Sequence, residues 1–180
     1  GTTSSTNNSS SDSGAVYVYK RTGTTWAQEA YIKASNNGVV DRFGYEVALD
    51  GDTLAVGAMD EDSNQTTITN GTTASSNNSN IDSGAAYVYK RSGTSWAQEA
   101  YIKAANSEFD DNYGGWEGSN MISLDKDTLV VGAIREDSNQ TSITNGTSAS
   151  SNNSAGDSGA VYVYRRTGAS WAQEAYIKSI

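Results

Sequence analysis

The chain has 180 residues, a formal net charge of −9, and no cysteine, histidine or proline. It therefore offers no disulfide, no thiolate zinc site and no imidazole base, and its acidic balance disfavours binding to the phosphate backbone of nucleic acids. No apolar run approaches the roughly 20 residues that a membrane-spanning helix needs, so no membrane span is expected.

The first predicted element is a tyrosine-rich hairpin that occurs three times. Its copies begin at Asp12, Asp82 and Asp157, and the first reads DSGAVYVYKRTGTTWAQEAYIKA. Apolar and polar residues alternate in AVYVYKR and again in WAQEAYIKA, with a glycine turn between them. This period of two, rich in β-branched and aromatic residues, predicts two antiparallel strands in each copy.

A second predicted hairpin lies between the copies of the first. It reads LDGDTLAVGA at 49–58 and LDKDTLVVGA at 124–133. Asp50-Gly51 between alternating apolar residues is a strong turn signal. Because Lys126 replaces Gly51 in the second copy, we expect a different type of turn there.

Two hairpins in each repeat of about 70 residues give four antiparallel strands per repeat. We expect an all-β fold of tandem four-stranded blades of the β-propeller type, with about two and a half repeats. Residues 1–40 form a partial repeat, 41–105 the first whole repeat, and 106–180 the second, which carries an insertion in its linker, 106–120. Since propellers need about 4–8 blades to close, the chain is expected to be a segment of a longer array or a subunit completed by its neighbours.

The sequence DRFGYEVALD at 41–50, followed by Val56-Gly57-Ala58 and Ser83-Gly84-Ala85, resembles the FG-GAP repeat. That repeat builds the β-propeller of integrin α-subunit heads and of many bacterial surface proteins. The second copy departs from the pattern, because Tyr113-Gly114 stands in place of Phe-Gly. The resemblance implies an extracellular or cell-surface protein.

A polar tract, SNQTTITNGTTASSNNSN at 63–80, returns almost unchanged at 138–155. The tracts contain Asn-x-Ser/Thr patterns, which accept N-linked glycans in exported proteins. The candidate glycosylation residues are Asn7, Asn8, Asn64, Asn70, Asn77, Asn139, Asn145 and Asn152. Two other interpretations stay open, a plain solvated loop and ordered strands that pair with neighbouring tracts.

A candidate metal site lies at Asp60, Asp62 and Asn64, which place oxygen atoms at every second residue as calcium loops do. The resemblance supports calcium, because some integrin blades hold it in such a loop. The alternative is an acidic turn that leaves a strand, since Arg135 replaces Asp60 in the second copy. No cofactor is required on this interpretation, and calcium is the one candidate.

A candidate ligand site lies in the inserted linker, whose residues do not recur elsewhere. Trp116, with Asp110 and Asp111, could hold a sugar or a protein partner, and packing within the linker is the alternative. The recurring Trp26, Trp96 and Trp171 are expected to pack between blades.

Together these patterns predict a non-catalytic extracellular structural or adhesive repeat protein, glycosylated and self-assembling into a fibre or surface layer. Its partners would be identical subunits or further repeats, and covalent glycans. The alternative is a calcium-assisted propeller module that binds a protein or a glycan.

Overall fold

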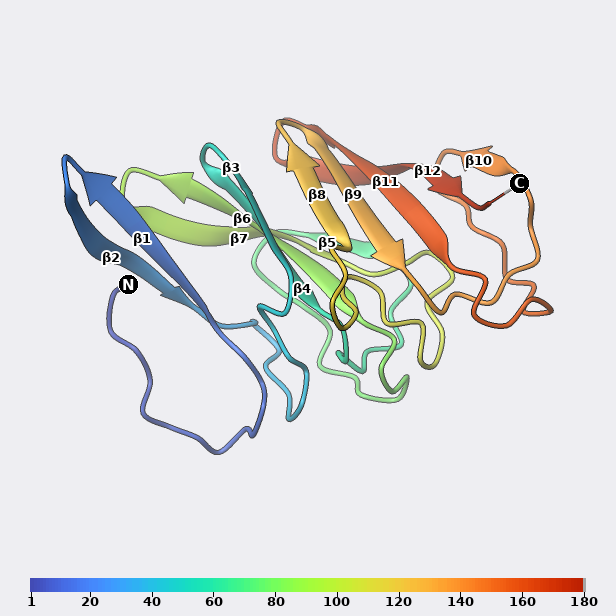
Figure 1. Cartoon of the computed structure of the whole chain (residues 1–180), viewed down its shortest axis with the longest axis horizontal. Coiled ribbons are helices and arrows are strands. Elements are labelled where there is room, and N and C mark those ends of the chain that lie inside the picture. Colours follow the sequence, from blue (N-terminus) through green and yellow to red (C-terminus); the bar gives the residue numbers. More distant parts are fainter. Residues whose placement is uncertain (180) are drawn as a thin grey trace.

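Three antiparallel β-sheets follow one another in a row in the computed structural model, which describes residues 1–179 (Figure 1). The N-terminal sheet contains β1 (Val16–Thr22) and β2 (Thr25–Ile32). The middle sheet contains β3 (Val47–Asp50), β4 (Thr53–Ala58), β5 (Ile68–Asn70), β6 (Ala85–Ser92) and β7 (Ser95–Ile102). The C-terminal sheet contains β8 (Ile122–Asp125), β9 (Thr128–Ala133), β10 (Ile143–Asn145), β11 (Ala160–Thr167) and β12 (Ser170–Ile177). Within residues 1–179, no helix that could cross a membrane is found.

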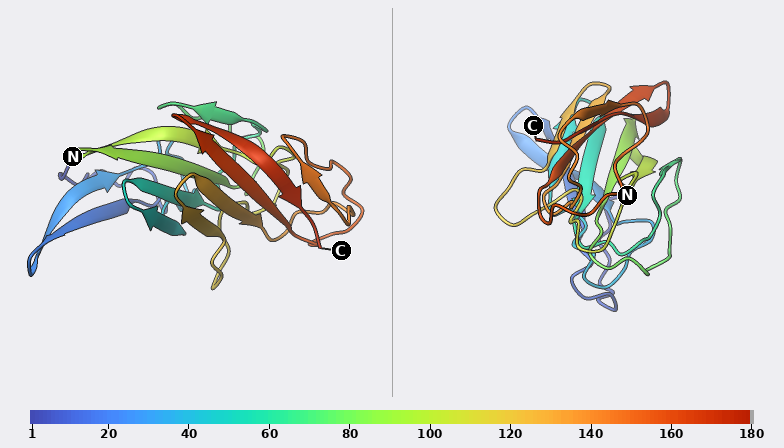
Figure 2. Two further views of the ribbon diagram at one scale, coloured as in Figure 1. Left: turned by 90° about the horizontal axis from the view of Figure 1, so that it is seen from above. Right: turned by 90° about the vertical axis from the view of Figure 1, so that its right-hand side faces the viewer.

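The prediction of an all-β fold with tandem antiparallel sheets is confirmed. The middle sheet has the strand order β3-β4-β6-β7-β5, and the C-terminal sheet has the order β8-β9-β11-β12-β10. The tyrosine-rich hairpins β1–β2, β6–β7 and β11–β12 follow one another along the row, and the two chain termini lie toward its opposite ends (Figures 1 and 2).

The polar tracts add a fifth strand that the hairpin pattern did not predict. Ile68–Asn70 pairs with Ile102–Ala100 of β7, and Ile143–Asn145 pairs with β12 in the same way. Each short strand therefore extends the sheet of its own repeat and does not pair with a neighbouring tract. The rest of each tract carries no regular strand and is mostly exposed.

The middle sheet is buried on both faces. Its side chains alternate between two apolar clusters, so that Tyr87 and Tyr89 pack toward the N-terminal sheet while Ala86 and Val88 pack toward the C-terminal sheet. This explains why β4 is buried along its whole length. We call the two sides of each sheet its tyrosine face and its valine face. The tyrosine faces carry Tyr17, Tyr19 and Tyr31 in the N-terminal sheet, Tyr87, Tyr89 and Tyr101 in the middle sheet, and Tyr162, Tyr164 and Tyr176 in the C-terminal sheet. The valine faces carry, in the same order, Val16, Val18, Ala30 and Ile32; Ala86, Val88, Ala100 and Ile102; and Val161, Val163, Ala175 and Ile177.

Linkers join the sheets by close backbone contact at a glycine. Gly14 forms a parallel bridge with Phe43, and Gly84 forms the same bridge with Tyr113. A Cβ atom on Gly84 would lie 2.2 Å from the carbonyl oxygen of Tyr113, and Gly84 has a φ of 77°. Only glycine fits this approach, which explains the DSGA sequence that opens each tyrosine-rich hairpin.

The expected difference between the two turns of the second hairpin type is wrong. Gly51 and Lys126 have φ values of 55° and 54°, so both copies use the same left-handed residue at the first loop position. In the second copy a lysine adopts this conformation, which costs an L-residue with a side chain about 1–2 kcal/mol.

Candidate functional site

The most regular feature of the molecule is a polar contact between successive sheets, which we call the latch. In the first junction, between the N-terminal and middle sheets, Glu29 of β2 accepts hydrogen bonds from Arg91 Nη2 at 2.6 Å and from Arg91 Nε at 2.7 Å. Trp96 Nε1 also donates to Glu29, at 3.1 Å. In the second junction, between the middle and C-terminal sheets, Glu99 Oε2 accepts hydrogen bonds from Arg166 Nη1 at 3.3 Å and from Trp171 Nε1 at 3.0 Å. The hydrogen bond from Arg91 lowers the pKa of Glu29.

A β-bulge directs each latch glutamate. Val18 pairs with Ala30 and Tyr19 pairs with Gln28, so Glu29 is the extra residue without a Cα partner. The same register shift occurs at Glu99 and Glu174. Because a bulge re-aims a side chain out of the strand's regular alternation, it turns the carboxylate toward the next sheet.

An asparagine reinforces the second junction. Asn70, the last residue of β5, accepts a hydrogen bond from Trp171 N at 2.7 Å and donates one to Trp171 O at 3.2 Å. Trp171 is only 2% exposed in this arrangement.

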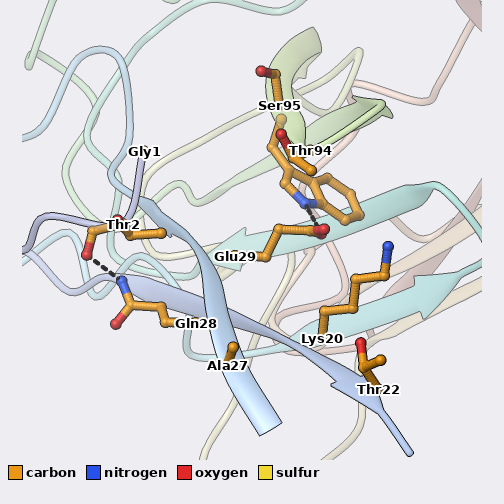
Figure 3. Close-up of a pocket in the computed structure, with 10 residues that line it drawn as sticks. Gly1, Thr2, Lys20, Thr22, Ala27, Gln28, Glu29, Thr94 and Ser95 are labelled. Atoms are coloured by element: carbon orange, nitrogen blue, oxygen red, sulfur yellow. Dashed lines mark hydrogen bonds between the residues drawn. The ribbon is translucent and has the colours of Figure 1, made fainter.

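A groove of about 620 Å³ lies beside Glu29 and Trp96 of the first junction (Figure 3). Gly1, Thr2, Ser95 and Trp96 are among the residues that line it. Gln28 donates to the carbonyl oxygen of Thr2, and Glu29 accepts from Trp96 Nε1. Trp96 is accordingly more exposed than Trp171.

Buried ion pairs form a second recurring feature. Lys103 Nζ lies 2.8 Å from Glu61 Oε2, and both side chains are at most 1% exposed. Tyr101 and Asn36 also donate to Glu61, and Asn36 comes from the linker after the preceding hairpin. The pair thus ties that linker to the middle sheet. Burial lowers the pKa of Lys103, and Glu61 opposes this effect.

The C-terminal sheet repeats this network, and the N-terminal sheet has only part of it. Glu136 and Lys178 form a pair at 2.5 Å, and Asn106 donates to Glu136 at 2.7 Å. Lys33, at the same position in the N-terminal sheet, instead donates to Ser13 Oγ and to the carbonyl oxygen of Gly14. No carboxylate of the described chain forms an ion pair with Lys33, and burial lowers its pKa.

The linker pocket, of about 450 Å³, is where the inserted segment meets the middle sheet. Arg135 Cζ lies 5.0 Å from the ring centroid of Trp116, and Arg135 Nη1 lies 2.6 Å from Asp110 Oδ2. Across the pocket, Arg42 Nε lies 3.1 Å from Asp60 Oδ2. Burial raises the pKa of Asp60 to about 6, and Arg42 opposes this.

Backbone strain is concentrated around the linker pocket. Its lining includes Val40, Arg42, Asp82, Asp110 and Asn112, all of which have positive φ values. A positive φ is especially unfavourable for the β-branched Val40, at 69°. Strained residues of this kind gather at binding sites when the surrounding structure holds them in place.

The predicted ligand residues divide. Trp116 and Asp110 come together in the linker pocket, as described. Asp111 instead is buried in the linker, where its Oδ2 accepts from Glu108 N at 2.8 Å. Burial raises the pKa of Asp111 to about 7. This favours a structural role for Asp111.

The predicted metal residues point to different partners. Asp60 is paired with Arg42, Asp62 Oδ1 accepts from Asp82 N at 3.0 Å, and Asn64 is exposed. In residues 1–179, no group of three or more acidic, histidine or cysteine side chains is placed to hold a metal ion. Calcium binding by this loop stays a prediction.

The predicted glycosylation residues are all exposed. Asn77 and Asn152 accept hydrogen bonds at Oδ1 from Ser79 and Ser154, and within residues 1–179 their Nδ2 atoms donate no hydrogen bond. Asn70 differs, because its Nδ2, the atom to which an N-linked glycan attaches, donates to Trp171. Whether any of these residues carries a glycan stays a prediction.

Sequence reasoning missed the latch and the buried ion pairs. The Glu of WAQEA, the second basic residue of YKR or YRR, and the Lys of YIK recur in every copy, which indicates a repeated role but does not identify their partners.

Fold and contacts define a class: a repeat protein whose sheets stack through the same apolar faces and the same polar latch at each junction. Residues 26–89 match the family model of the FG-GAP repeat, so the chain contains an FG-GAP repeat that runs from β2 into β6. The match includes Phe43-Gly44, on which the resemblance partly rested, and the predicted family is confirmed. FG-GAP repeats are typical of extracellular or surface proteins. No curated protein matches the chain.

Proposed function

We propose that this chain is a non-catalytic extracellular structural or adhesive repeat protein that self-assembles into a fibre or surface layer. The observation that carries the proposal is the use of one contact at both junctions. Glu29 with Arg91 and Glu99 with Arg166 are the same pair, one repeat apart. Stacked repeat proteins gain stability from each interface between neighbours, so a surface built for stacking favours further stacking.

A structural role also agrees with the distribution of charged groups. The buried carboxylates Glu61 and Glu136 are each bonded to a lysine, a tyrosine and an asparagine, which supports a role in holding the sheets together. Catalytic carboxylates would need access to a substrate. The exposed tracts would form the hydrated outer surface and carry glycans.

Sedimentation velocity over a range of concentrations, with electron microscopy of the same samples, tests self-assembly. We expect the sedimentation coefficient to rise with concentration and the particles to be elongated. A single species near 19.0 kDa at every concentration would contradict self-assembly. Intact mass and glycopeptide mapping of native material would test the glycans.

The linker pocket supports a second candidate, a calcium-assisted module that binds a glycan or a protein. The specific observation is Trp116 beside Asp60, Asp110 and two arginines in a strained pocket. Binding to a glycan array with and without calcium tests it. Trp116→Ala should abolish binding, while Phe109→Ala, which removes an exposed aromatic ring from the same linker, should not. Equal loss in both variants would argue against this pocket.

A further inference from the structure

The second junction shows how one sheet receives the next. Ala86, Val88 and Ile102 on the valine face of the middle sheet share an apolar cluster with Tyr162 and Tyr164 on the tyrosine face of the C-terminal sheet. The latch lies beside this cluster, where Glu99 and Asn70 hold Arg166 and Trp171. Each junction therefore has a direction, with a valine face and a glutamate on one side and a tyrosine face with Arg and Trp on the other.

The C-terminal sheet presents the first half of this contact to solvent. Val161 on its valine face is 37% exposed. Glu174 and Asn145, at the positions of Glu99 and Asn70, are both exposed. Neither side chain forms a hydrogen bond or an ion pair within the described part of the chain, whereas Glu99 is 11% exposed in its junction.

The N-terminal sheet presents the other half. Tyr17 and Tyr19 on its tyrosine face are 47% and 52% exposed, and Trp26 is 64% exposed. Arg21 occupies the position of Arg91 and Arg166 and is also exposed. Among residues 1–179, no carboxylate forms an ion pair with Arg21. The two ends of the molecule are thus complementary in the side chains that line them, in their hydrogen-bonding groups and in charge.

We propose that a second copy of this chain stacks head to tail on the C-terminal sheet and forms the latch between copies. Glu174 binds Arg21 and the indole nitrogen of Trp26 of the second copy, and Asn145 binds the backbone of that tryptophan. The valine face around Val161 covers the tyrosine face of the second copy. This inference rests on the proposed function and names the surface through which the chain assembles.

The contact joins unlike surfaces, and this determines what grows. A heterologous contact leaves one free valine face and one free tyrosine face after each addition, so copies add without limit unless the rotation closes a ring. The N-terminal sheet brings only the hairpin β1–β2 to the contact, so each joint is smaller than the second junction within the chain. We therefore expect reversible, concentration-dependent association that weakens as salt screens the exposed charges.

Two charge reversals test the latch. Glu174→Arg places two arginines in the contact, and Arg21→Glu places two glutamates there. Each variant alone should bind itself at least about tenfold more weakly than the wild type, since like charges in a contact are unfavourable. An equimolar mixture of the two variants should recover assembly, because every joint between unlike variants then pairs an arginine with a glutamate. Glu117→Arg, an exposed reversal outside the contact, is the matched control and should assemble like the wild type.

Sedimentation velocity of the four proteins and of the mixture separates the outcomes. Loss in both single variants with recovery in the mixture supports the latch, and the recovery also shows that both variants fold. Wild-type assembly that neither reversal changes would overturn the latch and leave the proposed self-assembly standing. A wild type that stays monomeric would overturn both.

Discussion

Equivalent residues of successive repeats lie in two environments, one at the second junction and the other on the outer surface of the C-terminal sheet. Gly84 contacts Tyr113 of the following linker and Asn70 contacts Trp171 of the next sheet, whereas Gly159 and Asn145, one repeat later, make no such contact within the described residues. The local sequence around each pair is nearly identical. A residue's energetic role in this fold is therefore set by the neighbouring sheet, and paired substitutions one repeat apart measure that role with the local sequence held constant.

The largest expected effect comes from removing a charge from a buried pair. Lys103→Met leaves Glu61 buried without its partner and should lower the free energy of unfolding by about 3–5 kcal/mol. Lys33→Met, at the same position in the N-terminal sheet, removes a lysine that has no carboxylate partner in the described chain and should cost about 1 kcal/mol or less. Urea unfolding of both variants measures the difference; equal losses would contradict it.

The pH dependence of stability should come next in size. Asp111 has a pKa of about 7 in the folded chain against an ordinary value of 3.8, so the folded chain keeps this proton over that range. The stability that protonated Asp111 provides is complete below about pH 4 and is lost as the pH rises to about 7, by roughly 2–4 kcal/mol. Burial raises the pKa of Asp41, its counterpart in the first junction, only to about 6. The stability that protonated Asp41 provides is therefore fully lost at a lower pH than that of Asp111.

Urea unfolding between pH 4 and pH 8 tests the role of Asp111. Asp111→Asn keeps an oxygen that can accept from Glu108 N and removes the titration. The stability curve of this variant should be flatter, and the variant should be more stable than the wild type at pH 8. A variant with an unchanged slope would contradict the assignment.

Alanine at the two glycines should separate close contact from backbone strain. Gly84→Ala places a Cβ atom 2.2 Å from the Tyr113 oxygen and should cost about 2–3 kcal/mol. The nearest atom to a Cβ on Gly159 is 3.1 Å away, and this glycine has a φ of 73°. Gly159→Ala should therefore cost less, about 1–2 kcal/mol, from the strain of a left-handed residue and a small adjustment of the neighbouring backbone oxygen. Thermal unfolding at one pH compares them.

The two asparagines should differ by a smaller amount. Asn70→Ala removes both hydrogen bonds to the Trp171 backbone and should lower stability by about 1–2 kcal/mol. Asn145→Ala should change the stability of the monomer by less than about 0.5 kcal/mol, as exposed substitutions do. These values should be measured at a concentration where the chain does not assemble, because Asn145 is expected to matter between copies.

The smallest effect compares the aromatic residues of the two linkers. The buried hydroxyl of Tyr113 has no hydrogen-bond partner within the described residues, and Phe43 occupies the same position in the first junction. Tyr113→Phe removes an unsatisfied polar group and should stabilise the chain by about 1 kcal/mol or less. A loss of stability on urea unfolding would show that the hydroxyl is bonded in solution.

Much of the fold could be predicted because alternation and turns are local properties of the sequence. Residues such as Tyr17, Tyr19 and Asp50 placed the hairpins, and the spacing of the copies gave the repeat. The bulge at Glu29 could not be predicted, since strict alternation continues through WAQEA in the sequence and the extra residue appears only against the partner strand. The left-handed Lys126 was missed because the turn keeps its shape despite an unfavourable residue.

The candidate site was predictable only in part. Trp116 and Asp110 could be singled out because they do not recur, and they do meet in one pocket. The pairing of Glu61 with Lys103 could not be found, because it joins different hairpins of one repeat and a linker of the previous one. Contacts between elements far apart in the sequence depend on how sheets stack, which no single pattern records.

The short strands β5 and β10 have a consequence for a chain of near-identical repeats. Such repeats are prone to exchange strands between molecules and to add to one another along open sheet edges. On one edge of each five-stranded sheet, the three-residue strand β5 or β10 pairs with part of the longer strand β7 or β12. A polar segment rich in asparagine and serine follows each short strand. The three-residue strand shortens the ladder open to an incoming strand, which favours the face-to-face stacking proposed above over edge-to-edge addition.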